Sequence, residues 1–167
     1  MAHAKIEKTN AARLLDRAKL KYELIPYQVD ERHLAATHVA EQLGEPIECV
    51  FKTLILKGER SGFFVCVVPG DHEVDLKAAA RISGNKKVAL IHVKELLPTT
   101  GYIRGGCSPI GMKKRFPTYI HSSITDHEAI YISAGVRGLQ IKMDPLDLIQ
   151  YVGAALGEIS QKGANEE

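Results

Sequence analysis

The sequence predicts an α+β domain in which helices surround a mixed, strongly curved sheet. The chain has 167 residues, of which 45% are apolar and 25% charged, as in an ordinary soluble domain. Helix and strand patterns follow one another in an order that is neither a strict βα alternation nor all-β. No repeat or long linker interrupts the chain. We therefore expect one domain over residues 1–167, with a core at about 11–156 and a poorly patterned tail at 157–167.

The N-terminal part of the chain has the pattern helix, strand, helix. Asn10 can cap a first helix that runs to Ala18, and Pro26 restricts the following strand, residues 22–27, to a sheet edge. Residues 34–43 repeat apolar side chains at helical spacing, and Gly44 can supply the left-handed stop.

The middle of the chain predicts a hairpin, a helix and a strand. Residues 50–56 and 63–68 have the composition of strands, and the glycines between them permit a tight reversal. Asp75 can cap a helix over 76–82, which a strand at 88–91 follows. A helical turn at 93–97 should stop at Pro98.

The C-terminal part predicts three strands and a final helix. A short strand at 118–121 precedes a pair of strands at 129–133 and 139–143, joined by a glycine-containing loop. Asp144 then caps the last helix, with Pro145 at its first position.

Several functional classes are excluded. The longest apolar run, residues 63–69, is far below the ~20 residues that span a bilayer, and the N-terminus lacks an apolar signal core. Cys49, Cys66 and Cys107 form no CxxC pair, which favours a reducing, cytoplasmic location. Nucleotide-binding glycine motifs, HExxH, a serine triad and zinc-like His/Cys spacing are absent, so we expect no cofactor and no metal.

Three features are candidates for chemistry. Lys52 falls inside an apolar strand, where it either sends its ammonium to water or faces a cleft and attracts phosphate or ester oxygens. The glycine-rich segment 101–111 is either a simple turn or a cradle whose N–H groups bind an oxyanion. Ser133, at a strand end, is either a turn serine or a hydroxyl projecting beyond the sheet.

Positive charge is concentrated in one segment. Residues 101–142 contain six basic residues and only two acidic ones, Asp126 and Glu128. This asymmetry suits a face that contacts a polyanion, although a solvated Lys/Arg cluster gives the same count.

An ordered set of motifs resembles the YbaK/EbsC family. The motifs are FKTL at 51–54, SGNKKV at 83–88, TGY at 100–102, GGCSPIG at 105–111, KKR at 113–115 and IYISAGVRGL at 130–139. The family comprises freestanding bacterial Cys-tRNA(Pro) deacylases related to the editing domain inserted in prolyl-tRNA synthetases. The resemblance implies a partly open mixed β-barrel flanked by helices. It also implies an enzyme that removes cysteine from tRNA(Pro) in trans, in the cytoplasm, with prolyl-tRNA synthetase as partner.

The resemblance also implies roles for particular residues. The catalytic set is Lys52, Gly105 and Gly106, with oxyanion-binding N–H groups expected near Gly105 to Ser108. The substrate-binding set is Tyr27, Thr53, Ser108, Pro109, Ser133 and Gln140. The positive segment supplies a tRNA-binding set of Lys113, Lys114, Arg115 and Arg137. Cys107 is not expected to be a nucleophile.

The mechanism implied by the family is substrate-assisted. The thiol of the attached cysteine attacks its own ester carbonyl, and the cysteine then leaves the tRNA as a cyclic thiolactone. The thiol can attack because a thiolate is a competent nucleophile near neutral pH. Gln140 replaces an acidic residue of some members, and Ala134 replaces a glycine. These departures leave two alternatives open: an Ala-tRNA(Pro) deacylase that uses water, and a non-catalytic module that binds tRNA or the synthetase.

Overall fold

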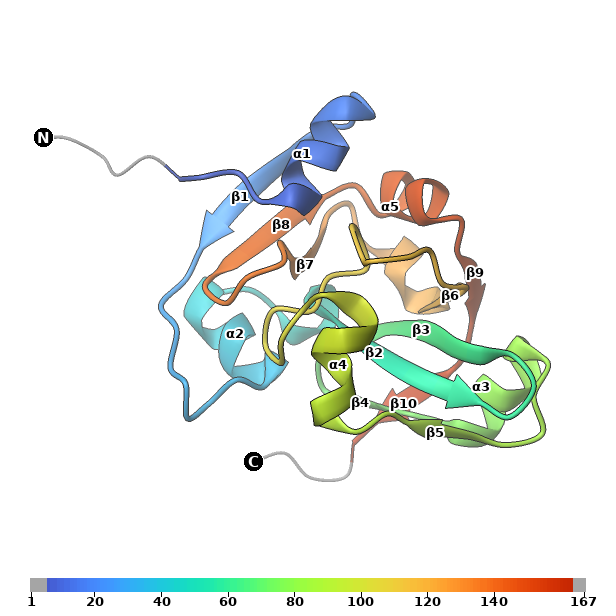
Figure 1. The fold of residues 1–167 in the computed structure, drawn as a ribbon. Coiled ribbons are helices and arrows are strands. Elements are labelled where there is room, and N and C mark those ends of the chain that lie inside the picture. Colours follow the sequence, from blue (N-terminus) through green and yellow to red (C-terminus); the bar gives the residue numbers. More distant parts are fainter. Residues whose placement is uncertain (1–5, 164–167) are drawn as a thin grey trace, which may run out of the picture.

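The computed structural model describes residues 6–163, whose strands form three sheets (Figure 1). The largest sheet has the order β5-β2-β3-β6-β9, the second β1-β8-β7, and the third pairs β10 with β4. The bounds in chain order are β1 Tyr22–Pro26, β2 Phe51–Gly58, β3 Gly62–Pro69, β4 His72–Val74, β5 Val88–Leu90, β6 Thr118–His121, β7 Ile130–Ser133, β8 Leu139–Met143, β9 Ala155–Gly157 and β10 Ser160–Lys162.

The predicted α+β class and mixed sheet are confirmed, but the barrel is not. In the largest sheet β5, β2 and β3 are antiparallel, whereas β3, β6 and β9 are parallel. Within residues 6–163 no sheet closes on itself, and the two larger sheets meet at one isolated bridge, Val50 with Tyr131. Strands β5 and β9 form the two edges of the largest sheet, and β5 pairs with β2 only at Leu56–Gly58.

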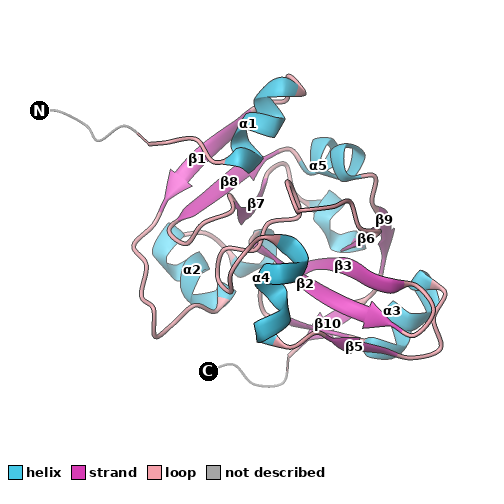
Figure 2. Ribbon diagram, in the orientation of Figure 1, coloured by secondary structure: helices cyan, strands magenta, loops and turns pink. Residues whose placement is uncertain are grey.

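Helices cover these sheets (Figure 2). They are α1 Asn10–Arg17, α2 Ala36–Leu43, α3 Leu76–Ser83, α4 Val93–Thr100 and α5 Pro145–Val152, with 3-10 turns at Ile47–Cys49 and Ser122–Asp126. The caps Asp75 and Asp144 are confirmed, since their side chains accept from backbone N–H groups of the helices they precede. None of the helices in the described part of the chain has the length and apolarity to cross a membrane.

Several helix boundaries differ from the prediction; α2, for example, begins at Ala36 and not at residue 34. Thr9, and not Asn10, caps α1, because Thr9 is extended and its hydroxyl accepts from the Ala12 N–H at 3.2 Å. Helix α4 continues through Pro98 to Thr100 and ends at Gly101, whose φ is 87°. Proline has a helix-compatible φ, so it removes one hydrogen bond near the end of a short helix without ending it.

The largest sheet is buried on both faces. Phe51, Ile55 and Val65 pack against Ile132 and Ile141 of the second sheet, in the main core. On the opposite face, Leu56, Phe64, Cys66 and Val68 pack with Ala79 of α3 and with Ile159.

The segment after Gly157 completes the third sheet. Ile159 is buried, and β10 pairs with β4 through Ser160 opposite Val74. The tail predicted at 157–167 is therefore paired as far as Lys162, and residues 164–167 lie outside the described residues.

Candidate active site

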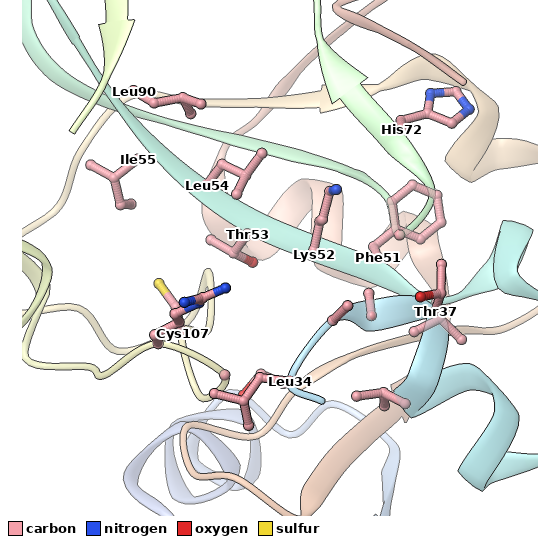
Figure 3. Close-up of a pocket in the computed structure, with 18 of the residues that line it drawn as sticks. Leu34, Thr37, Phe51, Lys52, Thr53, Leu54, Ile55, His72, Leu90 and Cys107 are labelled. Atoms are coloured by element: carbon pink, nitrogen blue, oxygen red, sulfur yellow. The ribbon is translucent and has the colours of Figure 1, made fainter. Parts of the chain in front are cut away.

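A cavity of about 560 Å³ lies along β2, and five predicted site residues line it (Figure 3). The five come from β2, the glycine-rich loop, β7 and β8, and are Lys52, Thr53, Gly105, Ser133 and Gln140. Other walls come from the start of α2, the β3–β4 turn and the junction of β5 with α4. The fold thus brings together residues that are up to 88 positions apart, Lys52 and Gln140.

The cavity follows the edge of β2 between the Val50–Tyr131 bridge and the pairing with β5 at Leu56–Gly58. The Ile55 carbonyl on this edge accepts from the Ile91 N–H at 3.1 Å, where the chain leaves β5. Main-chain groups two residues apart in a strand point to the same side, so the N–H and carbonyl of Thr53 also face this edge. The backbone of Thr53 therefore faces the cavity side of β2, as the Ile55 carbonyl does.

Lys52 and Thr53 lie on opposite sides of the strand. In Figure 3 Lys52 extends toward the side of His72, whereas Thr53 lies on the side of Cys107. Burial lowers the pKa of Lys52 below its usual value, and the charges of Asp71 and Glu73 oppose this shift. Within residues 6–163 the Lys52 ammonium makes no hydrogen bond and no ion pair. It can therefore bind an anionic or ester oxygen. 

Two buried polar atoms of the lining have no partner. They are the Thr53 hydroxyl and the Gln140 carbonyl oxygen, on residues only 9% and 5% exposed. An unpaired buried polar atom costs stability, and a bound ligand or an ordered water can complete the hydrogen bond of each. Ser133 stands opposite Gln140 in the β7–β8 register, and its hydroxyl accepts from the Gly135 N–H at 3.0 Å.

Within residues 6–163 the glycine-rich loop carries N–H groups without a partner on residues that line the cavity. The Gly106 N–H is bonded to the Ile103 carbonyl at 2.9 Å. Those of Gly105 and Cys107, both lining residues, have no partner in the described part of the chain. Gly105 has φ +88°, and a Cβ there would lie 3.2 Å from the Arg137 Nε. The N–H groups of Gly105 and Cys107 are therefore available for the oxyanion role expected of this loop, whereas that of Gly106 is already bonded to Ile103.

Cys107 lines the cavity but is a poor nucleophile. Burial raises the pKa of its thiol to about 12, so the thiol is protonated near neutral pH. This agrees with the expectation that Cys107 does not attack the substrate.

Four predicted residues lie outside the lining. Ser108 is fully buried and its hydroxyl accepts from the Ile110 N–H, while Pro109 is buried beside it. Gly106 packs against the backbone of Val136, where a Cβ would come within 3.2 Å. Tyr27 follows β1, with its N–H bonded to the Gly138 carbonyl. These contacts hold the loops that shape the cavity.

The predicted tRNA-binding residues divide into two groups. Lys113, Lys114 and Arg115 are exposed together before β6. Arg137 instead donates from Nε to the Arg104 carbonyl at 2.9 Å, which ties the loop after β7 to the glycine-rich loop.

Sequence reasoning missed a charged wall of the cavity. Asp71, His72 and Glu73 follow β3, and the His72 Nδ1 lies 2.8 Å from the Ser160 hydroxyl of β10. The predicted hairpin could have indicated this wall. An antiparallel hairpin that pairs Lys52 with Val68 brings the residues just after Pro69 close to Lys52. Arg104 and His92 also line the cavity without having been predicted.

Replacing Thr53 with valine tests the unpaired hydroxyl. We expect the free energy of unfolding to rise by about 1 kcal/mol, because valine removes a buried group without a partner. Turnover in the cavity should slow roughly fivefold to tenfold if a ligand uses this hydroxyl. Chemical denaturation and single-turnover kinetics measure the two effects.

The matched control is Thr118→Val, since the buried Thr118 hydroxyl donates to the Phe116 carbonyl at 3.1 Å. That variant should lose stability. A destabilised Thr53→Val protein would contradict the assignment of a free, ligand-directed hydroxyl.

Residues 31–151 match the family model for the aminoacyl-tRNA editing domain. The chain belongs to the aminoacyl-tRNA editing domain family. The resemblance inferred from the motifs is thereby confirmed, and two curated relatives agree with it. This editing domain is 47% identical over 156 residues to an Enterococcus faecalis protein named "Putative Cys-tRNA(Pro)/Cys-tRNA(Cys) deacylase EbsC", covering 93% of this chain and 95% of that one. It is also 35% identical over 78 residues to a proline–tRNA ligase of Fervidobacterium nodosum, covering 47% of this chain and 13% of the ligase.

Solved structures share the fold of this editing domain. One, of a hypothetical protein, has a TM-score of 0.82 at 21% identity and covers 89% of this chain and 97% of its own. Another is titled "Crystal structure of a putative trans-editing enzyme for prolyl tRNA synthetase", with a TM-score of 0.78 at 22% identity, covering 90% and 92%.

Proposed function

We propose that this editing domain is a trans-acting deacylase that removes cysteine from Cys-tRNA(Pro). The observation that carries the proposal is the cavity itself. It gathers Lys52, two free loop N–H groups and two unpaired polar atoms around a space that lacks an activated protein nucleophile. The family and the relative named as a deacylase support the same activity.

A reaction assisted by the substrate fits such a cavity. The thiolate of the cysteinyl group attacks its own carbonyl carbon, a C–S bond forms, and the C–O bond to the ribose breaks. The ribose oxygen takes up a proton and the cysteine leaves as a four-membered thiolactone. Ser133 cannot replace this nucleophile, because in the described residues its hydroxyl is bonded only to the Gly135 N–H and not to a base.

The protein contributes positioning and charge. The N–H groups of Gly105 and Cys107 stabilise the oxyanion, at about 3 kcal/mol for each well-placed donor. The Lys52 ammonium binds the terminal phosphate or the ester oxygen. The Gln140 oxygen and the Thr53 hydroxyl hydrogen-bond the α-amino group and fold the chain into attack geometry, which offsets the strain of the small ring.

Binding of the tRNA body is assigned to Lys113, Lys114, Arg115 and Arg137. These cations contact phosphates, so affinity falls as salt rises and does not depend on base sequence. We assign recognition of the tRNA identity to a partner, because residues 6–163 form an editing fold around one cavity of about 560 Å³. Specificity for tRNA(Pro) therefore comes from prolyl-tRNA synthetase, with which the protein acts in the cytoplasm.

Deacylation time courses on a panel of substrates test the function. We expect rapid loss of cysteine from Cys-tRNA(Pro), with Ala-tRNA(Pro) and Ser-tRNA stable beyond their spontaneous hydrolysis. A nucleophilic trap added to the reaction should capture the thiolactone. Loss of alanine would instead establish attack by water, and tRNA binding without any turnover would establish a non-catalytic module.

Ala-tRNA(Pro) is the second candidate substrate, because the amide of Gln140 can bond the α-amino group of either aminoacyl ester and does not by itself select cysteine. Some family members resemble this chain but carry an acidic residue there, and a neutral acceptor binds a cationic amino group less strongly than a carboxylate. Hydrolysis of Ala-tRNA(Pro) at a rate comparable to that of Cys-tRNA(Pro) would support this alternative.

The rate should depend on pH through two groups. As pH rises, kcat/KM increases because the substrate thiol, with a pKa of about 8.5, ionises. At higher pH it falls as Lys52 loses its proton, and because burial lowers the pKa of Lys52 this limb lies below the usual lysine range. A pH–rate profile corrected for spontaneous hydrolysis measures both limbs. A flat profile would contradict both assignments.

A further inference from the structure

Four side chains alternate as cation, ring, ring and cation along one edge of the molecule. The Lys57 Nζ lies 5.3 Å from the centroid of the Phe63 ring. Phe63 meets Phe116 edge to face, with centroids 6.2 Å apart and planes at 80°. The Lys114 Nζ lies 5.8 Å from the Phe116 centroid. We call these four residues the aromatic strip.

The aromatic strip is accessible and carries uncompensated charge. Both lysines are exposed, and both rings are half-buried with one side packed on the main core. In the described residues neither Lys57 nor Lys114 is within ion-pair distance of a carboxylate. Two free ammonium groups therefore flank two partly exposed rings that come from different segments of the chain.

The aromatic strip begins where the cavity ends. Phe51, Thr53 and Ile55 line the cavity from one face of β2, and Lys57 is the next residue on that face, about 7 Å farther along the strand. Phe63 stands directly opposite Lys57 in the β2–β3 register. A chain that leaves the cavity past Ile55 consequently meets the strip next.

We propose that the aromatic strip binds the acceptor arm of the tRNA whose 3′ end enters the cavity. This inference rests on the proposed function. The lysines leave the rings to neutralise phosphates, and the ring faces that they then uncover on Phe63 and Phe116 stack against unpaired bases, the combination that single-stranded RNA requires. Lys114 thus acts with Lys57, Phe63 and Phe116, which the motifs had not assigned.

The binding of uncharged tRNA tests the strip without requiring deacylation. We expect the Lys57→Gln/Lys114→Gln protein to bind roughly tenfold more weakly at about 50 mM salt, and its log–log salt slope to fall by about 2. Fluorescence anisotropy with labelled tRNA, from about 50 to about 200 mM salt, measures both quantities.

The control is Lys19→Gln/Lys21→Gln, which removes the same charge in the exposed turn between α1 and β1. Wild-type affinity and slope in the strip variant, or an equal loss in this control, would overturn the proposal. A Phe63→Leu/Phe116→Leu protein keeps apolar packing but loses flat rings, and should bind roughly fivefold more weakly with an unchanged slope. If the phenylalanine variant does not fold, the affinity and salt slope of the Lys57→Gln/Lys114→Gln protein decide whether the proposal stands.

The outcomes separate this inference from the proposed function. Salt-dependent binding through the strip without any deacylation would overturn the deacylase assignment and leave the strip in place. Deacylation by a strip variant that binds RNA as tightly as the wild type would overturn the role of the strip and leave the deacylase assignment in place.

Discussion

Replacing Lys52 with methionine should lower kcat/KM for Cys-tRNA(Pro) about a hundredfold, the usual cost of removing one charged or oxyanion-stabilising group. Methionine keeps the unbranched stem within β2 and removes only the ammonium, which has no protein partner within residues 6–163. Single-turnover deacylation measures the change. The descending limb of the pH profile should disappear together with the activity.

The Lys52→Met protein should be at least as stable as the wild type. Burial lowers the pKa of Lys52 in the folded state, so the folded protein binds this proton less tightly than the unfolded chain does. The charged lysine therefore lowers the free energy of unfolding at pH values below its folded pKa. As pH rises from this pKa to the higher pKa of the unfolded chain, the free energy of unfolding increases. Lys21→Met, at an exposed position, is the control. A stable Lys52→Met protein with full activity would show that the ammonium has no part in the reaction.

Replacing Gly105 with alanine is the second large effect, and we expect kcat to fall at least about tenfold while the fold persists. The φ of +88° is strained for any residue with a Cβ, and the new atom would lie 3.2 Å from the Arg137 Nε and 3.3 Å from a Leu34 methyl group. Relief of this crowding moves the N–H groups of Gly105 and Cys107. Measurement of kcat and KM by single-turnover kinetics separates altered chemistry from altered binding.

Gly84→Ala is the matched control, because Gly84 has φ +76° and an added Cβ would meet nothing within 4 Å. It carries the same backbone strain at the end of α3, away from the cavity. Both variants should lose a similar amount of stability, about 1 kcal/mol. Equal kcat values in the two proteins would show that the glycine-rich loop does not position the reacting ester.

The strongly patterned elements were predictable and the three-residue strands were not. The hairpin of β2 and β3 and the helices capped by Asp75 and Asp144 follow from local periodicity and capping chemistry. By contrast, β4, β9 and β10 are too short to show a period, and their pairing depends on partners far away in the sequence. The division into three sheets depends on the same long-range pairings, which is why local patterns predict a mixed sheet but not how its strands are divided or whether they close into a barrel.

The site was predictable where a residue broke its local pattern. Lys52 stands out because it is a cation inside an apolar strand, and the loop around Gly105 because of its adjacent glycines. His72 and Arg104 break no pattern and enter the cavity wall only through tertiary contacts. Likewise, no local sequence pattern indicates that the Gly106 N–H donates to the Ile103 carbonyl while the N–H groups of Gly105 and Cys107 have no partner in the described residues.

The pairing of β4 with β10 has a consequence for synthesis on the ribosome. Strand β4 leaves the ribosome early, but its partner β10 begins at Ser160, 88 residues beyond His72 along the chain. At a typical elongation rate this interval lasts roughly 5 to 20 seconds. During that time the edge that carries His72 is unpaired, and this wall of the cavity is among the last parts of the protein to form.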